Sequence, residues 1–175
     1  MDASERGDTC RIHQIVQPLG ADLPDTLAGQ AAILGFCCDE GVSRNHGRIG
    51  AREAPDQVRR ALASLPAHQL KNLYDAGDID CPDNNLELAQ SRLADRISNL
   101  LNASSRLAVI GGGHEIAYGS YLGLDRHLRS TEQSGTVLVL NLDAHFDLRT
   151  SRPGSSGTPF DQMFEHAAQN GRSVR

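Results

Sequence analysis

Short apolar runs alternate with longer amphipathic stretches along most of this 175-residue chain, and this alternation limits the choice of fold. Four runs have the length and composition of buried strands: residues 31–37, 70–76, 107–110 and 136–142. A strand followed by a helix and then by another strand is typical of parallel sheets with crossover helices. The chain is therefore predicted to adopt an α/β fold with a mainly parallel sheet.

The stretches between these runs carry apolar residues at helical spacing. Pro55 is a favoured first-turn residue, and the apolar residues after it fall at i, i+3, i+4 and i+7: Val58, Ala61, Leu62 and Leu65. A second apolar stripe covers residues 86–101 and a third covers 117–128, while 160–175 can begin a further helix. We expect a helix at each of these places.

Composition and length narrow the class of protein. A chain of this length can bury one core, and we expect an irregular segment at 1–30 followed by part of a single domain at 31–175. The formal charge of −5 disfavours nucleic acid as a partner, and no apolar stretch is long enough to cross a membrane. The four cysteines lack CxxC spacing, which indicates reduced thiols in a cytoplasmic protein.

Polar motifs follow two of the predicted strands. His114 follows three glycines directly after one strand, and Asp143, His145 and Asp147 follow the next. Alternate residues of an extended backbone point to the same side, and ligand sites of parallel sheets lie at the carboxyl ends of the strands. These four side chains are therefore predicted to form part of a metal site.

The donor types indicate which ions would suit this site. Imidazole mixed with carboxylates suits Mn²⁺, Zn²⁺ or Fe²⁺ better than Ca²⁺, and Asp143 is well placed to bridge two ions. Two ions about 3.5–4 Å apart can activate a shared water for attack on an unsaturated carbon. Each motif alone has a simpler interpretation: a glycine-rich turn, a hydrogen-bonded structural histidine, or a solvated acidic turn. Their joint placement at two strand ends favours the metal site.

At residues 111–115 and 143–147 the chain resembles the ureohydrolase family, which contains arginases, agmatinases and formimidoylglutamases. Three further segments are most similar to formimidoylglutamases: parts of residues 35–51, 74–79 and 148–160. Ser156 and Phe160 stand where agmatinases and arginases, respectively, place a histidine. Both differences favour formimidoylglutamase within the family.

The resemblance implies an arginase-like three-layer sandwich and a centre of two Mn²⁺ ions. His114, Asp143 and Asp147 would hold one ion, while His145 and Asp143 would hold the other. Asp147 would also be catalytic, taking a proton from the intermediate and passing it to the leaving amine. The implied reaction is hydrolysis of N-formimidoyl-L-glutamate to L-glutamate and formamide, a step of histidine degradation.

The resemblance also places Arg149, Ser156 and Thr158 beside the substrate. Arg149 suits a substrate with two carboxylates, because a guanidinium group binds carboxylates bidentately. We therefore expect a small-molecule substrate and neither a nucleic-acid nor a membrane partner, and a homo-oligomer is left open.

Two alternatives stay open. One is an agmatinase- or arginase-type activity. The other is an inactive fragment or pseudoenzyme, because the family completes its centre with a downstream Asp-x-Asp segment that this sequence does not contain. The second ion would then have only His145 and Asp143. On this interpretation the carboxy-terminal strands of the fold are missing, and we expect the open sheet edge to promote self-association.

Overall fold

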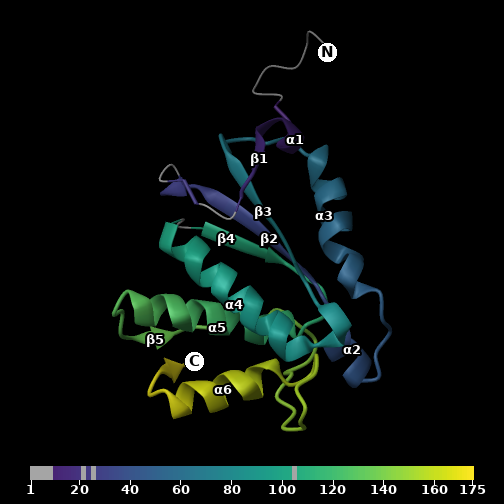
Figure 1. Ribbon diagram of the computed structural model, residues 1–175, viewed down its shortest axis with the longest axis vertical. Helices are drawn as coiled ribbons and strands as arrows, with labels where there is room; N and C mark the ends of the chain where they lie inside the picture. Colours follow the sequence, from purple (N-terminus) through teal and green to yellow (C-terminus); the bar gives the residue numbers. More distant parts are fainter. Residues whose placement is uncertain (1–9, 21–22, 25–26, 104–105) are drawn as a thin grey trace.

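A parallel sheet forms the centre of the molecule (Figure 1). The computed structural model describes residues 10–20, 23–24, 27–103 and 106–175. The sheet has four strands in the order β1-β3-β2-β4, with these bounds in chain order: β1 Val16–Pro18, β2 Ala31–Cys37, β3 Leu73–Asp80 and β4 Arg106–Ile110. The predicted fold class is confirmed. β2 occupies its predicted run, whereas β3 lies further along the chain than 70–76.

Helices cover both faces of this sheet. The longer ones are α3 (Ala54–Ala63), α4 (Leu86–Ala103), α5 (Ile116–Ser130) and α6 (Pro159–Gln169). Leu34 and Phe36 of β2 pack against α4, while a Cβ at Gly35 would lie 2.9 Å from the Pro55 Cβ of α3. Because alternate strand residues point to opposite faces, α3 and α4 lie on opposite sides of the sheet. The architecture is a three-layer α/β/α sandwich, with α5 packed on α4.

Shorter elements connect these layers. They are α1 (Ile12–Ile15), α2 (Glu40–Arg44), the 3₁₀ turns η2 (Ala51–Glu53) and η3 (Pro82–Asn84), and the strands β5 (Thr136–Val137) and β6 (Ser173–Val174). No helix in the described parts of the chain is both long and apolar enough to span a bilayer.

The main core forms where α4 meets the sheet. Its large buried side chains recur at helical spacing: Leu86, Leu93, Ile97 and Leu100. They pack with Leu34 and Phe36, which are both fully buried. Each fully buried side chain of this size contributes about 1.5–3 kcal/mol. The predicted helices at 86–101 and 117–128 are confirmed.

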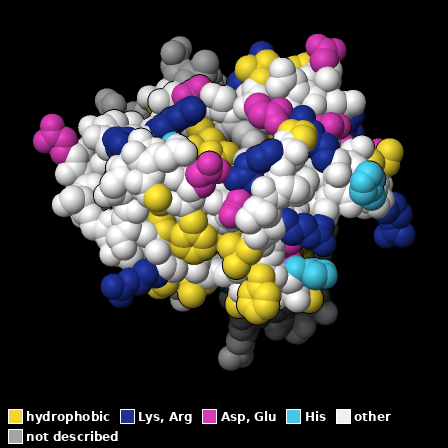
Figure 2. Space-filling model, turned by 90° about the horizontal axis from the view of Figure 1, so that it is seen from below, with side chains coloured by type: hydrophobic (Ala, Val, Ile, Leu, Met, Phe, Trp, Pro, Cys, Tyr) yellow, Lys and Arg dark blue, Asp and Glu magenta, His cyan; other side chains and the backbone are white. Residues whose placement is uncertain are grey.

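The apolar run 136–142 does not form the buried strand that we expected. Only β5 is a strand, and it pairs with β6 rather than with the main sheet. Leu138, Leu140 and Leu142 are 69%, 79% and 101% exposed. A strand needs a neighbouring backbone to pair with its N–H and C=O groups. Among the described residues such a neighbour reaches only as far as Val139, whose N–H donates to the Arg175 carbonyl at 2.8 Å. Patches of hydrophobic side chains are also visible from the side of α6 (Figure 2).

α3 begins at Ala54, with Pro55 in its first turn as predicted, but its apolar stripe is largely exposed. Val58 is 36% exposed, and Leu65, which we predicted within the helix, lies beyond its end at Ala63 and is 49% exposed, whereas Pro55 is buried against the sheet. Arg59 fastens the helix to β3 through Asp75, with Nε 2.7 Å from the carboxylate. The spacing of the apolar residues thus predicted the helix. The Arg59–Asp75 ion pair and the buried Pro55 determine which face of the helix meets the sheet.

The segment before residue 31 is more regular than we expected. It contains α1 and the short strand β1, which pairs in parallel with β3 at one edge of the sheet. Pro18 ends β1, a position that an edge strand tolerates because no ladder hydrogen bond is lost there. The prediction of an irregular segment is therefore wrong for residues 12–18.

Candidate metal centre

His114 lies beyond the carboxyl end of β4, in the turn that leads into α5. Gly113 connects this turn to the residue that follows β2, because its N–H donates to the Cys38 carbonyl at 2.9 Å. At Gly112 a Cβ would lie 2.0 Å from the Cys38 oxygen and 2.7 Å from the Phe36 oxygen. Only glycine lets the backbone at residue 112 lie this close to the backbone of Phe36 and Cys38. This close packing fixes the position of His114 beyond the end of β4.

We expect Gly112→Ala to destabilise the protein and displace His114, because the added methyl group meets backbone atoms rather than a flexible side chain. Overpacking costs about 1–3 kcal/mol, and we expect a loss near the upper end of this range. Urea denaturation measures it. Gly111→Ala is the matched control, since a Cβ there meets only Ile116 Cδ1 at 3.9 Å. Equal losses in both variants would contradict the packing argument.

Three side chains from two distant segments converge at this turn. Nδ1 of His114 lies 2.7 Å from Oδ2 of Asp147 and 3.9 Å from Oδ2 of Asp143. One candidate ligand atom from each residue lies within 4.8 Å of the others. The Asp147 side chain is only 14% exposed, so part of this group is shielded from water. One imidazole and two carboxylates in this arrangement can hold a divalent cation.

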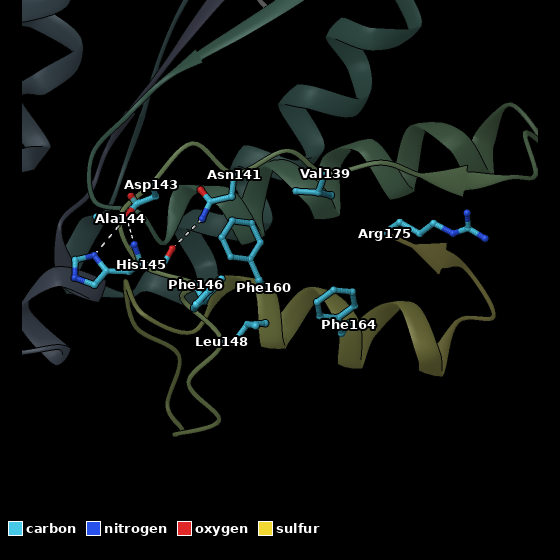
Figure 3. A pocket seen from close by; sticks show the side chains of 10 residues that line it. All are labelled: Val139, Asn141, Asp143, Ala144, His145, Phe146, Leu148, Phe160, Phe164 and Arg175. Atoms are coloured by element: carbon cyan, nitrogen blue, oxygen red, sulfur yellow. Dashed lines mark hydrogen bonds and ion pairs between the residues drawn. The ribbon is translucent and has the colours of Figure 1, made fainter.

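Phe160 supports the imidazole of His114 from the side. The two ring centroids are 5.6 Å apart and the rings meet edge to face at 77°. The Phe160 N–H also donates to the Asp147 carbonyl at 3.3 Å, which brings the start of α6 to the same place. Figure 3 shows Phe160 among the residues that line a hollow together with Asp143. The sequence identified Phe160 only as a replaced histidine and carried no signal for this ring contact.

Residues 143–147 form a turn rather than the extended strand end that we predicted. Asp143 Oδ1 accepts a hydrogen bond from the His145 N–H at 2.8 Å, and Asp147 has a left-handed φ of 48°. The argument from alternate positions is therefore wrong for this segment. The turn brings Asp143 and Asp147 to His114, while the His145 side chain stays 77% exposed, with Nδ1 3.3 Å from Asp143 (Figure 3).

The charge of Asp143 follows from these contacts. The hydrogen bond from the His145 backbone lowers the pKa of the Asp143 carboxyl below its ordinary value, and nearby His114 acts in the same direction. Asp143 is therefore ionised at neutral pH. Because a second carboxylate, Asp147, lies in the same group, a bound cation would relieve the repulsion between them.

Two of the predicted substrate residues, Arg149 and Ser156, lie together and share Asn45 as a partner. Nδ2 of Asn45 donates to Ser156 Oγ at 3.1 Å, and its Oδ1 accepts from Nη1 of Arg149. The Ser156 N–H donates to the Gly41 carbonyl at 3.0 Å, which fastens the loop to α2. We did not select Asn45 from the sequence, where its only signal was its place in the segment 35–51.

Thr158, the third predicted substrate residue, is turned inward. It is 0% exposed, and its hydroxyl accepts a hydrogen bond from the Ser155 N–H at 2.9 Å. The same hydroxyl lies 2.8 Å from Oε1 of Gln162. These contacts close the turn before α6, so in this structure Thr158 shapes the loop.

Glu115 connects the His114 turn to α2. The sequence analysis included it only as the last residue of the segment 111–115 and gave it no role. It is 1% exposed, and its Oε1 accepts from the Gly41 N–H at 2.9 Å. Gln90 donates to the Glu115 carbonyl at 2.8 Å. Burial raises the pKa of the Glu115 carboxyl, and its Oε2 has no hydrogen-bond partner among the described residues. This side chain therefore joins the candidate site to α2 from inside the core.

A three-layer α/β sandwich with an imidazole and two carboxylates gathered beyond its parallel strands defines an α/β protein with a candidate metal centre. The sequence profile of the arginase family matches residues 29–175. The chain belongs to the arginase family.

Known relatives agree with this assignment. Formimidoylglutamase from Cupriavidus pinatubonensis is 50% identical over 172 residues, which cover 98% of this chain and 54% of that protein. An arginase superfamily protein from Trypanosoma cruzi superimposes with a TM-score of 0.73 at 29% identity, over 96% of this chain and 56% of that one. The T. cruzi formiminoglutamase solved with Mn²⁺ gives a TM-score of 0.66 at 32% identity, and the match covers 83% of this chain and 51% of that one. The chain spans about half the length of the curated relatives it matches.

Proposed function

We propose that the protein containing this chain is a manganese-dependent hydrolase that cleaves N-formimidoyl-L-glutamate in histidine degradation. The observation that carries this proposal is the convergence of His114, Asp143 and Asp147 beyond the parallel strands. It occurs in a chain that is 50% identical to a formimidoylglutamase.

The donor set fits manganese. Imidazole nitrogen and carboxylate oxygen suit this ion, and the group contains no thiolate of the kind that favours structural zinc. We assign one ion to His114, Asp143 and Asp147, and a second to His145 and Asp143. In support, the imidazoles of both histidines approach the Asp143 carboxylate, His114 at Oδ2 and His145 at Oδ1. Bound Mn²⁺ would activate water for attack on the formimidoyl carbon.

Asp147 is the proposed proton-transfer residue. Water adds across the C=N bond of the formimidoyl group: its oxygen bonds to the carbon as a hydroxyl and its other proton goes to the imino nitrogen, which gives a tetrahedral adduct. Asp147 takes the proton of that hydroxyl and delivers it to the glutamate nitrogen as the C–N bond breaks, which leaves formamide and L-glutamate. Its low exposure of 14% supports this role, since proton transfer is most efficient where bulk water is excluded.

Arg149 and Ser156 are the proposed substrate-binding residues. Arg149 would bind a substrate carboxylate through two parallel N–H···O bonds, and Ser156 would add a hydroxyl contact. Both stand in the loop that leaves Asp147 and returns at Phe160, so both ends of the loop lie beside the candidate metal site. Thr158 holds the shape of this loop from its buried position.

Location and assembly stay predictions. A cytoplasmic location is supported by Cys38 and Cys81, which are buried and form no disulfide. Self-association is supported by the exposed leucines after β5. Size-exclusion chromatography with light scattering tests the assembly, and a monodisperse monomer would contradict it.

The test of function is an assay of the whole protein with N-formimidoyl-L-glutamate and Mn²⁺. We expect release of L-glutamate and formamide, loss of this activity on chelation with EDTA, and recovery when Mn²⁺ is restored. Agmatine and arginine serve as comparison substrates, and turnover of either one instead would reject the specificity. If two ions bind per chain and none of the three compounds is hydrolysed, the protein is an inactive member of the family.

A further inference from the structure

Arg149 differs from a neighbouring arginine in what surrounds its charge. Arg152, in the same loop, lies 2.8 Å from Asp161 and 2.6 Å from Glu165. Among the residues that the structure describes, no carboxylate lies within 4.0 Å of the Arg149 guanidinium. The protein therefore neutralises Arg152 but leaves the charge of Arg149 available.

Asn45 holds the Arg149 guanidinium with a neutral group. Its Oδ1 accepts from Nη1 of Arg149, and its Nδ2 donates to Ser156 Oγ at 3.1 Å, so both ends of the amide are used. The Asn45 N–H donates to the Gly41 carbonyl at 3.1 Å, which fixes the residue at the end of α2. An amide oxygen orients a guanidinium group without cancelling its charge.

The backbone of Gly157 also packs against the Arg149 side chain. A Cβ at Gly157 would lie 3.0 Å from Nη1 and 3.1 Å from Cδ of Arg149, so the side chain lies directly on the loop backbone. The Arg149 N–H donates to the Gly157 carbonyl at 3.0 Å. A guanidinium has five N–H donors, and within the described chain only the bond to Asn45 uses one of them. Enough donors remain for a bidentate contact.

We propose that Asn45 is a positioning residue that determines specificity for carboxylate-bearing substrates. It orients Arg149 and leaves the guanidinium charge and its remaining donors for a carboxylate of the substrate. The inference rests on the proposed function, in which Arg149 binds the substrate, and extends it to the end of α2. A carboxylate at position 45 would instead pair with Arg149 and compete with the substrate.

Asn45→Asp and Asn45→Ala in the whole Mn²⁺-loaded protein test this role. We expect Asn45→Asp to raise KM for N-formimidoyl-L-glutamate by about 10- to 100-fold, as for the loss of a charge-assisted contact. We expect kcat to change by less than about 3-fold. Asn45→Ala should raise KM less, because it loosens Arg149 without neutralising it. Calorimetric binding of L-glutamate should weaken in the same order. Asn102→Asp, which adds the same charge at an exposed position of α4, is the matched control.

Four results would overturn the inference: an unchanged KM and L-glutamate affinity in Asn45→Asp, a fall confined to kcat, an equal rise of KM in Asn102→Asp, or no L-glutamate binding by the wild-type protein. Failure of the proposed function gives a different result. A wild-type protein that binds L-glutamate but does not hydrolyse the substrate would refute the activity, and the L-glutamate affinities of the variants would still decide the role of Asn45.

Discussion

Asp147→Asn is expected to lower kcat by about 10²- to 10⁴-fold, the usual effect of losing a general acid–base group. The amide keeps the size of the carboxylate, but it can neither take a proton from the adduct nor carry negative charge. Nδ1 of His114 lies 2.7 Å from the Asp147 carboxylate, so the substitution also removes the negative charge beside that imidazole and leaves one neutral acceptor oxygen. Mn²⁺ titration should show weaker binding, and a steady-state assay with N-formimidoyl-L-glutamate measures kcat.

A second carboxylate near the loop supplies the control for this result. Asp161 pairs with Arg152 at 2.8 Å and does not belong to the group around His114. We expect Asp161→Asn to keep kcat within about 2-fold of wild type. If Asp147→Asn retains wild-type turnover and Mn²⁺ affinity, Asp147 is neither the proton-transfer residue nor a ligand.

Asp125→Asn is expected to lower the free energy of unfolding by about 3–5 kcal/mol, the usual cost of breaking a buried ion pair. Asp125 is 2% exposed and lies 2.7 Å from Nε of Arg129 and 2.5 Å from Nε of Arg172. His166 Nε2 approaches the same carboxylate at 3.1 Å. This carboxylate joins α5 to α6 and to Arg172, whose side chain is only 10% exposed, so the substitution leaves that guanidinium without its charged partner. Urea denaturation measures the effect.

The contribution of Asp125 should also depend on pH. Burial by itself raises the pKa of Asp125, but hydrogen bonds from Arg129, His166 and Arg172 outweigh it and lower the pKa below its ordinary value. In the unfolded chain the pKa of this carboxyl is about 3.9. Because its pKa is lower in the folded protein, the ionised carboxylate stabilises the fold at every pH above about 3.9. This stabilisation is lost as the pH falls from the unfolded pKa through the folded pKa. The difference between wild type and Asp125→Asn should therefore be constant near neutrality and shrink in acid below about pH 4.

An exposed ion pair of similar geometry provides the comparison. Asp95 lies 2.6 Å from Nη1 of Arg126, but its side chain is 69% exposed. Exposed pairs contribute about 0–1 kcal/mol, so we expect Asp95→Asn to cost no more than this. Equal destabilisation by Asp95→Asn and Asp125→Asn would show that burial of the Asp125 cluster does not matter.

Local spacing was sufficient to predict most of the central elements. β2, α4 and α5 follow from apolar runs of strand length and from stripes at helical period. The placement of His114 after β4 also followed from sequence, because carboxyl ends of parallel strands meet at one edge. Asp143 and Asp147 lie beside His114 because of a turn and not because of the extended backbone that we predicted, and His145 lies outside that group.

Orientation and pairing were less predictable. The run after β5 has the composition of a strand, yet Leu142 is fully exposed because no described backbone lies beside it. The stripe of α3 has helical spacing, yet Pro55 and the Arg59–Asp75 ion pair set the side that meets the sheet. In each case the deciding partner lies outside the segment that carries the pattern.

The order of residue types along the chain is enough to specify the layers of the fold and the chemical donors at the strand ends, since both arise from neighbours a few positions apart. The contacts that shape the candidate site arise differently. Asn45 meets Arg149 and Ser156 across 104 and 111 positions, and the exposure of His145 depends on a turn closed by Asp143. Such contacts are stable only once the layers have packed, because ordering long separated side chains costs entropy that isolated pairs do not recover.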